Sequence, residues 1–214
     1  MLDFIQLGAN QGDTETDYIY KVQQKNNWRG ILVEPHPHSY KLLKENYKDR
    51  EGLLFENVAI RNYDGVTQLH YQDASGLNEQ ASVIGNHHLT GKPSNEVMEV
   101  PCATLATLIR KYELEYKVFY LLEMDIEKGE SEVILSTNFD VVCPYYIRFE
   151  DVHHTPDEQK RIKMHLAEYN YVPLEDPIIM GLEQVTERPD YMKAYKYNGS
   201  SQKQSRDKEI IGGS

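Results

Sequence analysis

The sequence has 214 residues, 40% of them apolar, which is enough for one domain with a full hydrophobic core. Its 34 acidic and 23 basic residues give a formal net charge of −11, which argues against binding to nucleic acid or to anionic membranes. The lack of a long apolar segment and of a secretory signal predicts a cytoplasmic protein with no membrane insertion.

The first part of the chain alternates short apolar runs with amphipathic segments. Buried strands are predicted at residues 4–7, 30–33 and 53–60. Asp13 or Thr14 is expected to cap the first intervening helix, and the second helix is expected over residues 38–47. The turn at residues 62–65 predicts that the following residues, 66–71, form a hairpin with the third strand.

A polar segment over residues 72–96 precedes a second series of elements. Strands are predicted at residues 97–101, 118–124 and 145–149, and helices at residues 104–112 and 130–135. Thr155, Pro156 and Glu158 form the pattern of a helix N-terminus.

A final antiparallel hairpin is expected from residues 171–174, 183–186 and 191–197. Residues 198–214 are rich in Ser, Gln, Lys and Gly, and are expected to be a disordered tail or a linker remnant after one domain at residues 1–197.

This order of elements, with a Gly-rich first turn, predicts an α/β fold. Its core is a mainly parallel, doubly wound sheet that ends in antiparallel strands. In such a sheet a ligand lies beyond the carboxyl ends of the strands, where the strand order reverses. Functional residues are therefore expected at strand ends.

The loop Gly8-Ala9-Asn10-Gln11-Gly12 follows the first strand. Its glycines let backbone N–H groups approach a ligand, although the same spacing also fits an ordinary tight turn. Glu34 ends the second strand and favours a ligand, because an acidic side chain there can accept hydrogen bonds from both ribose hydroxyls of an adenosine. The alternative for Glu34 is a solvated carboxylate before the Pro35–Pro37 turn.

Two further strands end in carboxylates, and two histidines follow the second of them. These residues are Asp125, Glu127, Glu150, Asp151, His153 and His154. If the sheet is wound as predicted, they lie on the same edge as Gly8 and Glu34. Anions there repel a pyrophosphate and attract a sulfonium or an ammonium group, which favours S-adenosylmethionine over NAD or ATP.

The motifs that carry a family resemblance are, in order, FIQLGANQGDTET, ILVEPHPHSYKLLKENY, NVAI, VPCATLATLI, YLLEMDIEKGESEVIL and PYYIRFE. Over about residues 4–150 they resemble the FkbM family of S-adenosylmethionine-dependent methyltransferases. The resemblance implies a Rossmann-like class I methyltransferase fold with a mainly parallel seven-stranded sheet. It also implies methyl transfer to a hydroxyl oxygen, commonly on sugars or polyketide-like natural products.

Carried over residue by residue, the resemblance implies a place for each part of the cofactor. The first loop lies under the methionine part, Glu34 is at the ribose, Val58 flanks the adenine, and Asp125 is beside the transferring methyl group. Ser82, in the long polar segment, is expected to cover the cofactor. The expected cofactor-binding residues are Gln6, Gly8, Ala9, Asn10, Gly12, Glu34, Pro35, Asn57, Val58, Ala59, Ser82 and Asp125.

The sequence departs from the family pattern near these positions. Gln6 stands where an Asp is usual, Glu123 where a Lys is usual, and Lys128-Gly129 where Gly and a small residue are usual. An anion in place of a cation at Glu123 is expected to alter the orientation of the acceptor or to attract a divalent metal.

An acceptor hydroxyl has to lose its proton during methyl transfer. Asp125, His153 and Glu150 are the expected catalytic residues, with Asp125 or one of the paired histidines as the base. The histidines can equally be structural groups. Alternatively, a Mg²⁺ or Mn²⁺ ion held by Asp125, Glu150 and Asp151 lowers the pKa of the hydroxyl.

The expected function is S-adenosylmethionine-dependent O-methylation of a hydroxyl on a small-molecule sugar or a glycan. A further expectation is that the domain is tethered to others in a larger glycan-modifying protein. A NAD-dependent dehydrogenase or epimerase is an alternative that would use the same glycines and Glu34. A non-catalytic domain that binds a cofactor or a glycan is the other.

Overall fold

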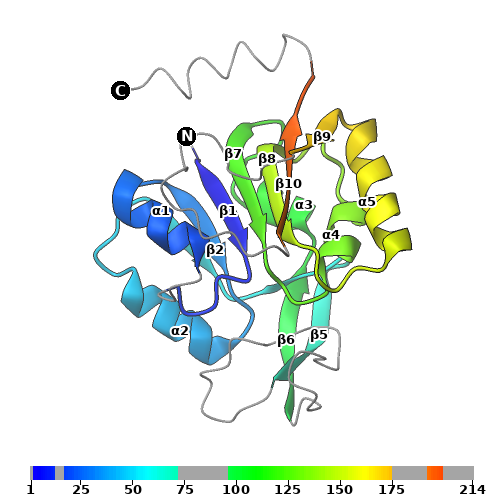
Figure 1. The fold of residues 1–214 in the computed structure, drawn as a ribbon. Coiled ribbons are helices and arrows are strands. Elements are labelled where there is room, and N and C mark those ends of the chain that lie inside the picture. Colours follow the sequence, from blue (N-terminus) through cyan, green and yellow to red (C-terminus); the bar gives the residue numbers. More distant parts are fainter. Residues whose placement is uncertain (1, 13–16, 72–95, 175–191, 200–214) are drawn as a thin grey trace.

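The computed structural model describes residues 2–12, 17–71, 96–174 and 192–199 (Figure 1). The elements are β1 (Phe4–Leu7), α1 (Tyr18–Asn26), β2 (Gly30–Val33), α2 (Pro37–Asn46), β3 (Leu53–Glu56), β4 (Ala59–Ile60), β5 (Gly65–Tyr71), β6 (Glu96–Ala103), α3 (Leu105–Lys111), β7 (Val118–Met124), α4 (Glu130–Ser136), β8 (Cys143–Glu150), α5 (Pro156–Glu168), β9 (Tyr171–Pro173) and β10 (Met192–Tyr197).

Seven strands form the central sheet in the order β3-β2-β1-β7-β8-β10-β9. The first five of these are parallel, and β10 runs antiparallel to both β8 and β9. The prediction of a mainly parallel seven-stranded sheet with a C-terminal antiparallel hairpin is therefore confirmed. The strand order reverses between β1 and β7, so the crevice beyond the carboxyl ends of these two strands is where a ligand is expected.

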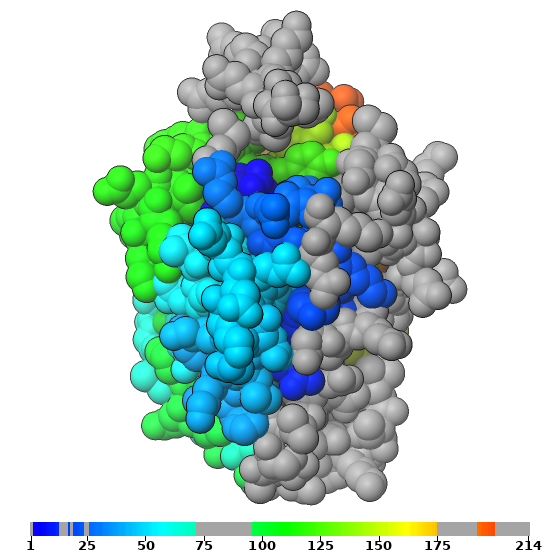
Figure 2. Space-filling model, turned by 90° about the vertical axis from the view of Figure 1, so that its left-hand side faces the viewer, coloured from blue at the N-terminus to red at the C-terminus, as the bar shows by residue number. Residues whose placement is uncertain are grey.

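Helices cover both faces of this sheet (Figure 1). Ile19 of α1 and Leu43 of α2 pack with Phe4 of β1 on one face. On the other face, α3, α4 and α5 pack against alternate strand residues such as Ile5 and Leu122. Figure 2 views the first face, with the blue and cyan side chains of α1 and α2 toward the viewer. Because both faces are covered, the parallel strands are nearly continuous runs of buried residues, as in other parallel sheets.

The capping residues explain where two helices begin. Asp17 caps α1 by accepting a hydrogen bond from the backbone N–H of Tyr20, so the predicted cap at Asp13 or Thr14 is wrong. The competing polar residues in that stretch made the choice ambiguous. The predicted start of α5 is confirmed, since Thr155 and Glu158 form a reciprocal capping box with Pro156 in the first turn.

A second, three-stranded sheet has the order β4-β6-β5 and extends below the main sheet in Figure 1. The predicted strand at residues 53–60 is in fact two strands, β3 in the main sheet and β4 in the small one. The break falls at Asn57, whose side-chain amide donates to the backbone oxygens of Glu34 and Pro35 and turns the chain away. The predicted hairpin of residues 66–71 with the third strand is also wrong, because β5 pairs with β6.

Three predictions lie wholly or mainly outside the described residues: the strand at residues 183–186, the role of Ser82, and the tail or linker remnant at residues 198–214, of which only residues 198 and 199 are described. Among the helices of the described ranges, none is long and apolar enough to cross a membrane.

Candidate active site

The loop after β1 is fixed to the end of β2. The backbone N–H groups of Gly8 and Ala9 both donate to the carbonyl of Val33 at 3.0 Å. The N–H of Asn10 donates to Oε2 of Glu34 at 2.8 Å. These N–H groups are therefore satisfied within the protein, and they hold the loop in place before any ligand arrives.

The glycines of this loop are required by close packing as well as by backbone conformation. Gly8 and Gly12 have φ of +81° and +70°, in the left-handed region that disfavours side chains. A Cβ atom on Gly8 would lie 1.9 Å from the carbonyl oxygen of Asp125. On Gly12 it would lie 2.5 Å from side-chain atoms of Leu43 and Tyr47. The loop can thus lie directly against the end of β7 and against α2.

Glu34 is 5% exposed and both of its carboxylate oxygens are used. Oε2 accepts from Asn10, and Oε1 accepts from the backbone N–H of His36 at 2.8 Å. Burial raises the pKa of Glu34 to about 7, and the two hydrogen bonds oppose that rise. Each carboxylate oxygen keeps acceptor capacity for a further donor, such as a hydroxyl of a ligand.

A pocket lies between these ends of β1, β2 and β7. Its lining residues are Leu7, Gly8, Asn10, Val33, Glu34, Pro35, Val58, Ala59, Ile60, Leu69, Asp125, Ile126 and Glu127. In the part of the chain that is described, this lining has three carboxylates and no Lys, Arg or His. Its chemistry fits a ligand with a cationic part and an apolar ring, and does not fit a polyphosphate.

Apart from Gln6 and Ser82, the predicted cofactor residues divide into two groups. The ones that line the pocket are Gly8, Asn10, Glu34, Pro35, Val58, Ala59 and Asp125. The others support it from behind: Ala9 is buried in the core beside α1 and α2, Gly12 packs on α2, and Asn57 holds the turn after β2. Sequence reasoning missed Ile60 and Leu69, because their strands belong to the small sheet whose pairing it did not predict.

Gln6 lies on the sheet face that α1 covers, and its Nε2 donates to Oδ1 of Asp17 at 3.2 Å. Burial raises the pKa of Asp17 to about 6. Gln6 therefore contacts an acid, Asp17, that caps α1. Position 6 was expected to bind the cofactor, and in this structure its side chain supports Asp17.

Glu123 was expected to alter the orientation of the acceptor or to attract a divalent metal. In the structure it forms an ion pair with Arg148. Glu123 lies beside Gln6 on β1 and beside Arg148 on β8 in the strand register. Glu123 and Arg148 form an ion pair in which the side chains are 5% and 7% exposed. Burial raises the pKa of Glu123, and the Arg148 guanidinium opposes the rise. The carboxylate of Glu123 is thus paired with a cation on the neighbouring strand.

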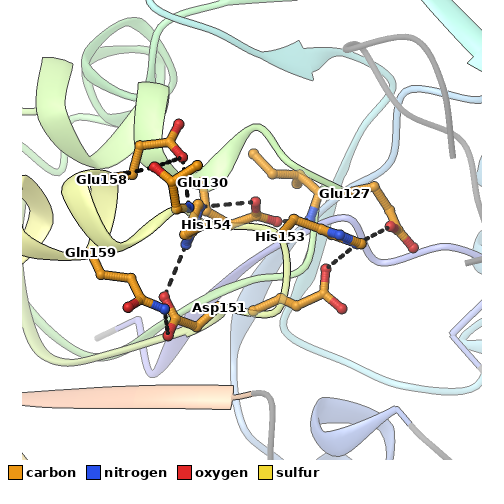
Figure 3. A network of polar contacts seen from close by, with 10 residues as sticks. Glu127, Glu130, Asp151, His153, His154, Glu158 and Gln159 are labelled. Carbon is orange, nitrogen blue, oxygen red and sulfur yellow. Dashed lines mark hydrogen bonds and ion pairs between the residues drawn. The ribbon is translucent and has the colours of Figure 1, made fainter. Parts of the chain in front are cut away.

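A cluster of acids and one histidine lies beside the pocket, beyond β7 and β8. Ligand atoms of Asp125, Glu130 and Glu150 lie within 4.8 Å of one another, and so do those of Glu127, Glu150 and His153. Nε2 of His153 is 3.5 Å from Oε2 of Glu127 and 3.6 Å from Oε2 of Glu150 (Figure 3). The prediction that Asp125, Glu150 and His153 meet at one edge of the sheet agrees with this geometry.

Burial and mutual proximity raise the pKa values of the acids in this cluster. Burial, followed by the charge of Asp125, raises the pKa of Glu127 to about 8 and that of Glu150 to about 7. Burial also raises the pKa of Asp125. Arg148 opposes the rise in the pKa of Asp125, and the residue remains exposed to solvent.

Asp151 faces a different part of the molecule, and His154 lies between Asp151 and the acidic cluster, with its Nε2 3.8 Å from Oε2 of Glu130. Asp151 accepts from Nε2 of Gln159 at 2.9 Å, and its Oδ1 is 3.1 Å from Nδ1 of His154 (Figure 3). Lys193 of β10 is 4.0 Å away. The structure therefore does not gather the predicted metal set of Asp125, Glu150 and Asp151, because Asp151 is held toward α5.

The sheet order and the strand-end site define the class of protein. Counted in chain order within the main sheet, the strands lie as 3-2-1-4-5-7-6, the arrangement of the Rossmann-like class I methyltransferase fold. A family model described as "Methyltransferase FkbM domain" matches residues 6–197, and the chain belongs to this family. The resemblance found in the sequence motifs is confirmed.

The FkbM methyltransferase from Methylobacillus flagellatus KT is similar in fold, with a TM-score of 0.51 and 11% identity. The match covers 92% of this chain and 43% of that one, so the chain spans less than half the length of this relative. No curated protein matches the sequence.

Two structures with lower TM-scores contain S-adenosyl-L-methionine or SAH. Fibrillarin from Aeropyrum pernix, with natively bound S-adenosyl-L-methionine, has a TM-score of 0.45 and 11% identity over 90% of this chain and 65% of that one. The N-terminal domain of human METTL16, in complex with SAH, has a TM-score of 0.45 and 9% identity over 93% and 63%.

Proposed function

We propose that this domain binds S-adenosylmethionine and transfers its methyl group to a hydroxyl oxygen of a sugar or a glycan. The observation that carries the proposal is the pocket at the reversal of strand order, in a domain of the FkbM methyltransferase family. Its three carboxylates suit a cofactor that carries a sulfonium and an ammonium group, and give no cation to bind a pyrophosphate.

Different residues of the pocket would bind different parts of the cofactor. Glu34, already fixed by Asn10 and His36, would accept hydrogen bonds from the ribose hydroxyls. The apolar side chains of Val58 and Leu69 would flank the adenine. Asp125 would face the positive charge at the reacting end. S-adenosylmethionine, when bound, supplies a methyl group activated by a sulfonium leaving group.

The chain's own contribution to the reaction is to position the acceptor and to remove its proton. A bond forms between the acceptor oxygen and the methyl carbon as the carbon–sulfur bond breaks, and the hydroxyl proton goes to a base. Asp125 is exposed in the pocket beside the expected position of the methyl group and is our candidate for that base. Glu150 and His153, whose side chains lie close together in the adjacent cluster, would orient the acceptor.

The test is to incubate the protein with S-adenosylmethionine and a panel of monosaccharides and oligosaccharides, with and without EDTA. Mass spectrometry would detect an acceptor that gains one methyl group and the matching formation of S-adenosylhomocysteine. Transfer to a nitrogen or carbon atom of some other acceptor class, with no transfer to any carbohydrate hydroxyl, would contradict the proposed substrate while leaving the cofactor assignment intact.

A further inference from the structure

The position of His153 between two carboxylates points to a ligand that the proposed methyl transfer does not by itself require. Glu127 follows β7, Glu150 ends β8, and His153 lies three residues beyond Glu150. The side chains of all three are largely buried, at 13%, 8% and 10% exposed. They come from two separate chain segments that meet at the edge of the pocket.

The distances between these side chains are typical of ligands that bind the same metal ion, and are too long for good hydrogen bonds. Nε2 of His153 lies 3.5 Å and 3.6 Å from the two carboxylate oxygens, beyond the range of a good hydrogen bond. Metal–ligand bonds of about 2.1 Å place neighbouring ligand atoms about 3 to 3.5 Å apart. Small side-chain adjustments would therefore bring all three atoms onto one ion.

Glu150 gives a second, independent indication that a cation binds here. The residue is 7% exposed, and its Oε2, the atom that faces His153, has no hydrogen-bond partner among the described residues. A buried carboxylate oxygen is almost always satisfied by a donor or a cation. Oε2 of Glu130, in the adjoining acidic group with Asp125 and Glu150, also has no hydrogen bond among the described residues, and Nε2 of His154 lies 3.8 Å from it.

The backbone conformation just after β7 also favours a preformed ligand site. Glu127 and Lys128 have φ of +55° and +81°, so two consecutive residues other than glycine adopt the left-handed conformation. Such conformations cost free energy and persist where the surrounding structure maintains them, often at functional positions. The Glu127 side chain that follows from this turn lines the pocket and contacts His153, as Figure 3 shows for the second contact.

We infer that Glu127, Glu150 and His153 form a binding site for a divalent first-row transition ion, of which Mn²⁺ is the best probe. An imidazole nitrogen with two carboxylates suits Mn²⁺, Fe²⁺ or Zn²⁺, whereas Mg²⁺ and Ca²⁺ prefer sites made of oxygen alone. This set replaces the predicted ligands Asp125, Glu150 and Asp151. Its negative charge also suits a cation.

Because Glu127 also lines the pocket, the ion would lie at the boundary between the cofactor pocket and the acceptor. There it would bind an acceptor oxygen and favour loss of its proton to Asp125. This role, unlike the binding of the ion, rests on the proposed methyltransferase function.

The experiment measures metal binding without turnover. The full chain is treated with EDTA, dialysed and titrated with MnCl₂, while the electron paramagnetic resonance signal of free Mn²⁺ is recorded. We expect one Mn²⁺ per chain, and an affinity at least about tenfold lower in Glu150→Gln and His153→Ala. An equal concentration of Mg²⁺ should not displace the Mn²⁺.

Two further variants decide between ligand sets. Asp157→Asn removes an exposed charge in the first turn of α5 and should leave Mn²⁺ binding unchanged. Asp151→Asn removes a carboxylate that this structure directs toward Gln159, and should also keep the ion. Loss of Mn²⁺ in Asp151→Asn with retention in Glu150→Gln and His153→Ala would overturn the proposed ligands.

Calorimetry with S-adenosylhomocysteine on the same samples separates the two proposals. Wild-type protein that binds S-adenosylhomocysteine but not Mn²⁺ would overturn the metal site alone. Protein that binds Mn²⁺ through these ligands but not S-adenosylhomocysteine would retain the site and contradict the proposed function. Retained S-adenosylhomocysteine binding in the variants shows that they are folded.

Discussion

At the scale of single residues, we expect Asp125 and Glu34 to have separable tasks. Both line the pocket, but Glu34 is buried and anchored by two backbone N–H groups, whereas Asp125 is exposed to solvent. A buried, preorganised acceptor suits recognition of a cofactor, and an accessible carboxylate suits removal of a proton. The two residues should therefore affect different measurements.

We expect Asp125→Asn to lower the rate of methyl transfer about 10²- to 10⁴-fold, because loss of a general base has an effect of this size. S-adenosylhomocysteine lacks the sulfonium charge, so its affinity should change little. Single-turnover kinetics and calorimetry measure the two quantities on the same variant. Wild-type transfer in Asp125→Asn would remove this residue from the mechanism.

Glu34 should make cofactor binding depend on pH. Its pKa of about 7 in the free protein lies above the ordinary value, and hydrogen bonds from a ribose would stabilise the ionised form. Affinity for S-adenosylhomocysteine should then fall as the pH decreases below about 7, by up to about tenfold per pH unit. Glu34→Gln should bind more weakly and lose this dependence. An identical pH profile in Glu34→Gln would show that another group is responsible.

At the scale of elements, the site depends on how closely the first loop approaches the end of β7. Asp125 continues the pairing of the strands, since its N–H donates to the carbonyl of Leu7 at 3.0 Å. The carbonyl oxygen of the same residue lies where a side chain on residue 8 would have to go, so only glycine fits there. The first loop and the end of β7 are thus one packed unit.

Gly8→Ala should therefore disrupt both stability and the pocket. The left-handed backbone alone costs about 1–2 kcal/mol, and a Cβ at 1.9 Å from the Asp125 oxygen forces the loop to move. Gly52→Ala is the matched control, with φ of +79° but only the flexible Arg29 side chain near its Cβ. Thermal unfolding should shift in both variants, and calorimetry should show loss of S-adenosylhomocysteine binding only in Gly8→Ala. Equal affinity in the two variants would contradict the role of this contact.

The ion pair between Glu123 and Arg148 joins β7 and β8 inside the sheet. Arg148→Leu should destabilise the fold by about 3–5 kcal/mol near neutral pH, because it leaves a buried carboxylate without its cation. The double variant Glu123→Leu with Arg148→Leu should recover most of that loss. Urea unfolding provides the free energies. If the double variant were as unstable as the single one, packing of Arg148 rather than its charge would be the cause.

At the scale of the whole molecule, the sequence predicted the main sheet and the edge that holds the site. Strands such as β1 and β7 are short apolar runs buried on both faces, and such runs are visible without a structure. Because parallel strands share one carboxyl edge, Asp125 and Glu150 could be placed together although they are far apart in the chain.

The small sheet and the ligand geometry could not be predicted in the same way. The run Leu53–Ile60 has no Gly or Pro where the chain leaves one sheet for another, and β5 finds its partner only beyond a long intervening segment. The closeness of Glu127 to His153 depends on a left-handed backbone at non-glycine residues, which composition does not reveal.

The most direct test of the central claim is a calorimetric titration of S-adenosylhomocysteine into the wild-type chain, with NADH as the comparison ligand. We predict one S-adenosylhomocysteine bound per chain, weaker binding in Glu34→Gln, and no binding of NADH. A folded wild-type protein that gives no heat with S-adenosylhomocysteine, or that binds NADH instead, would contradict the assignment of this pocket.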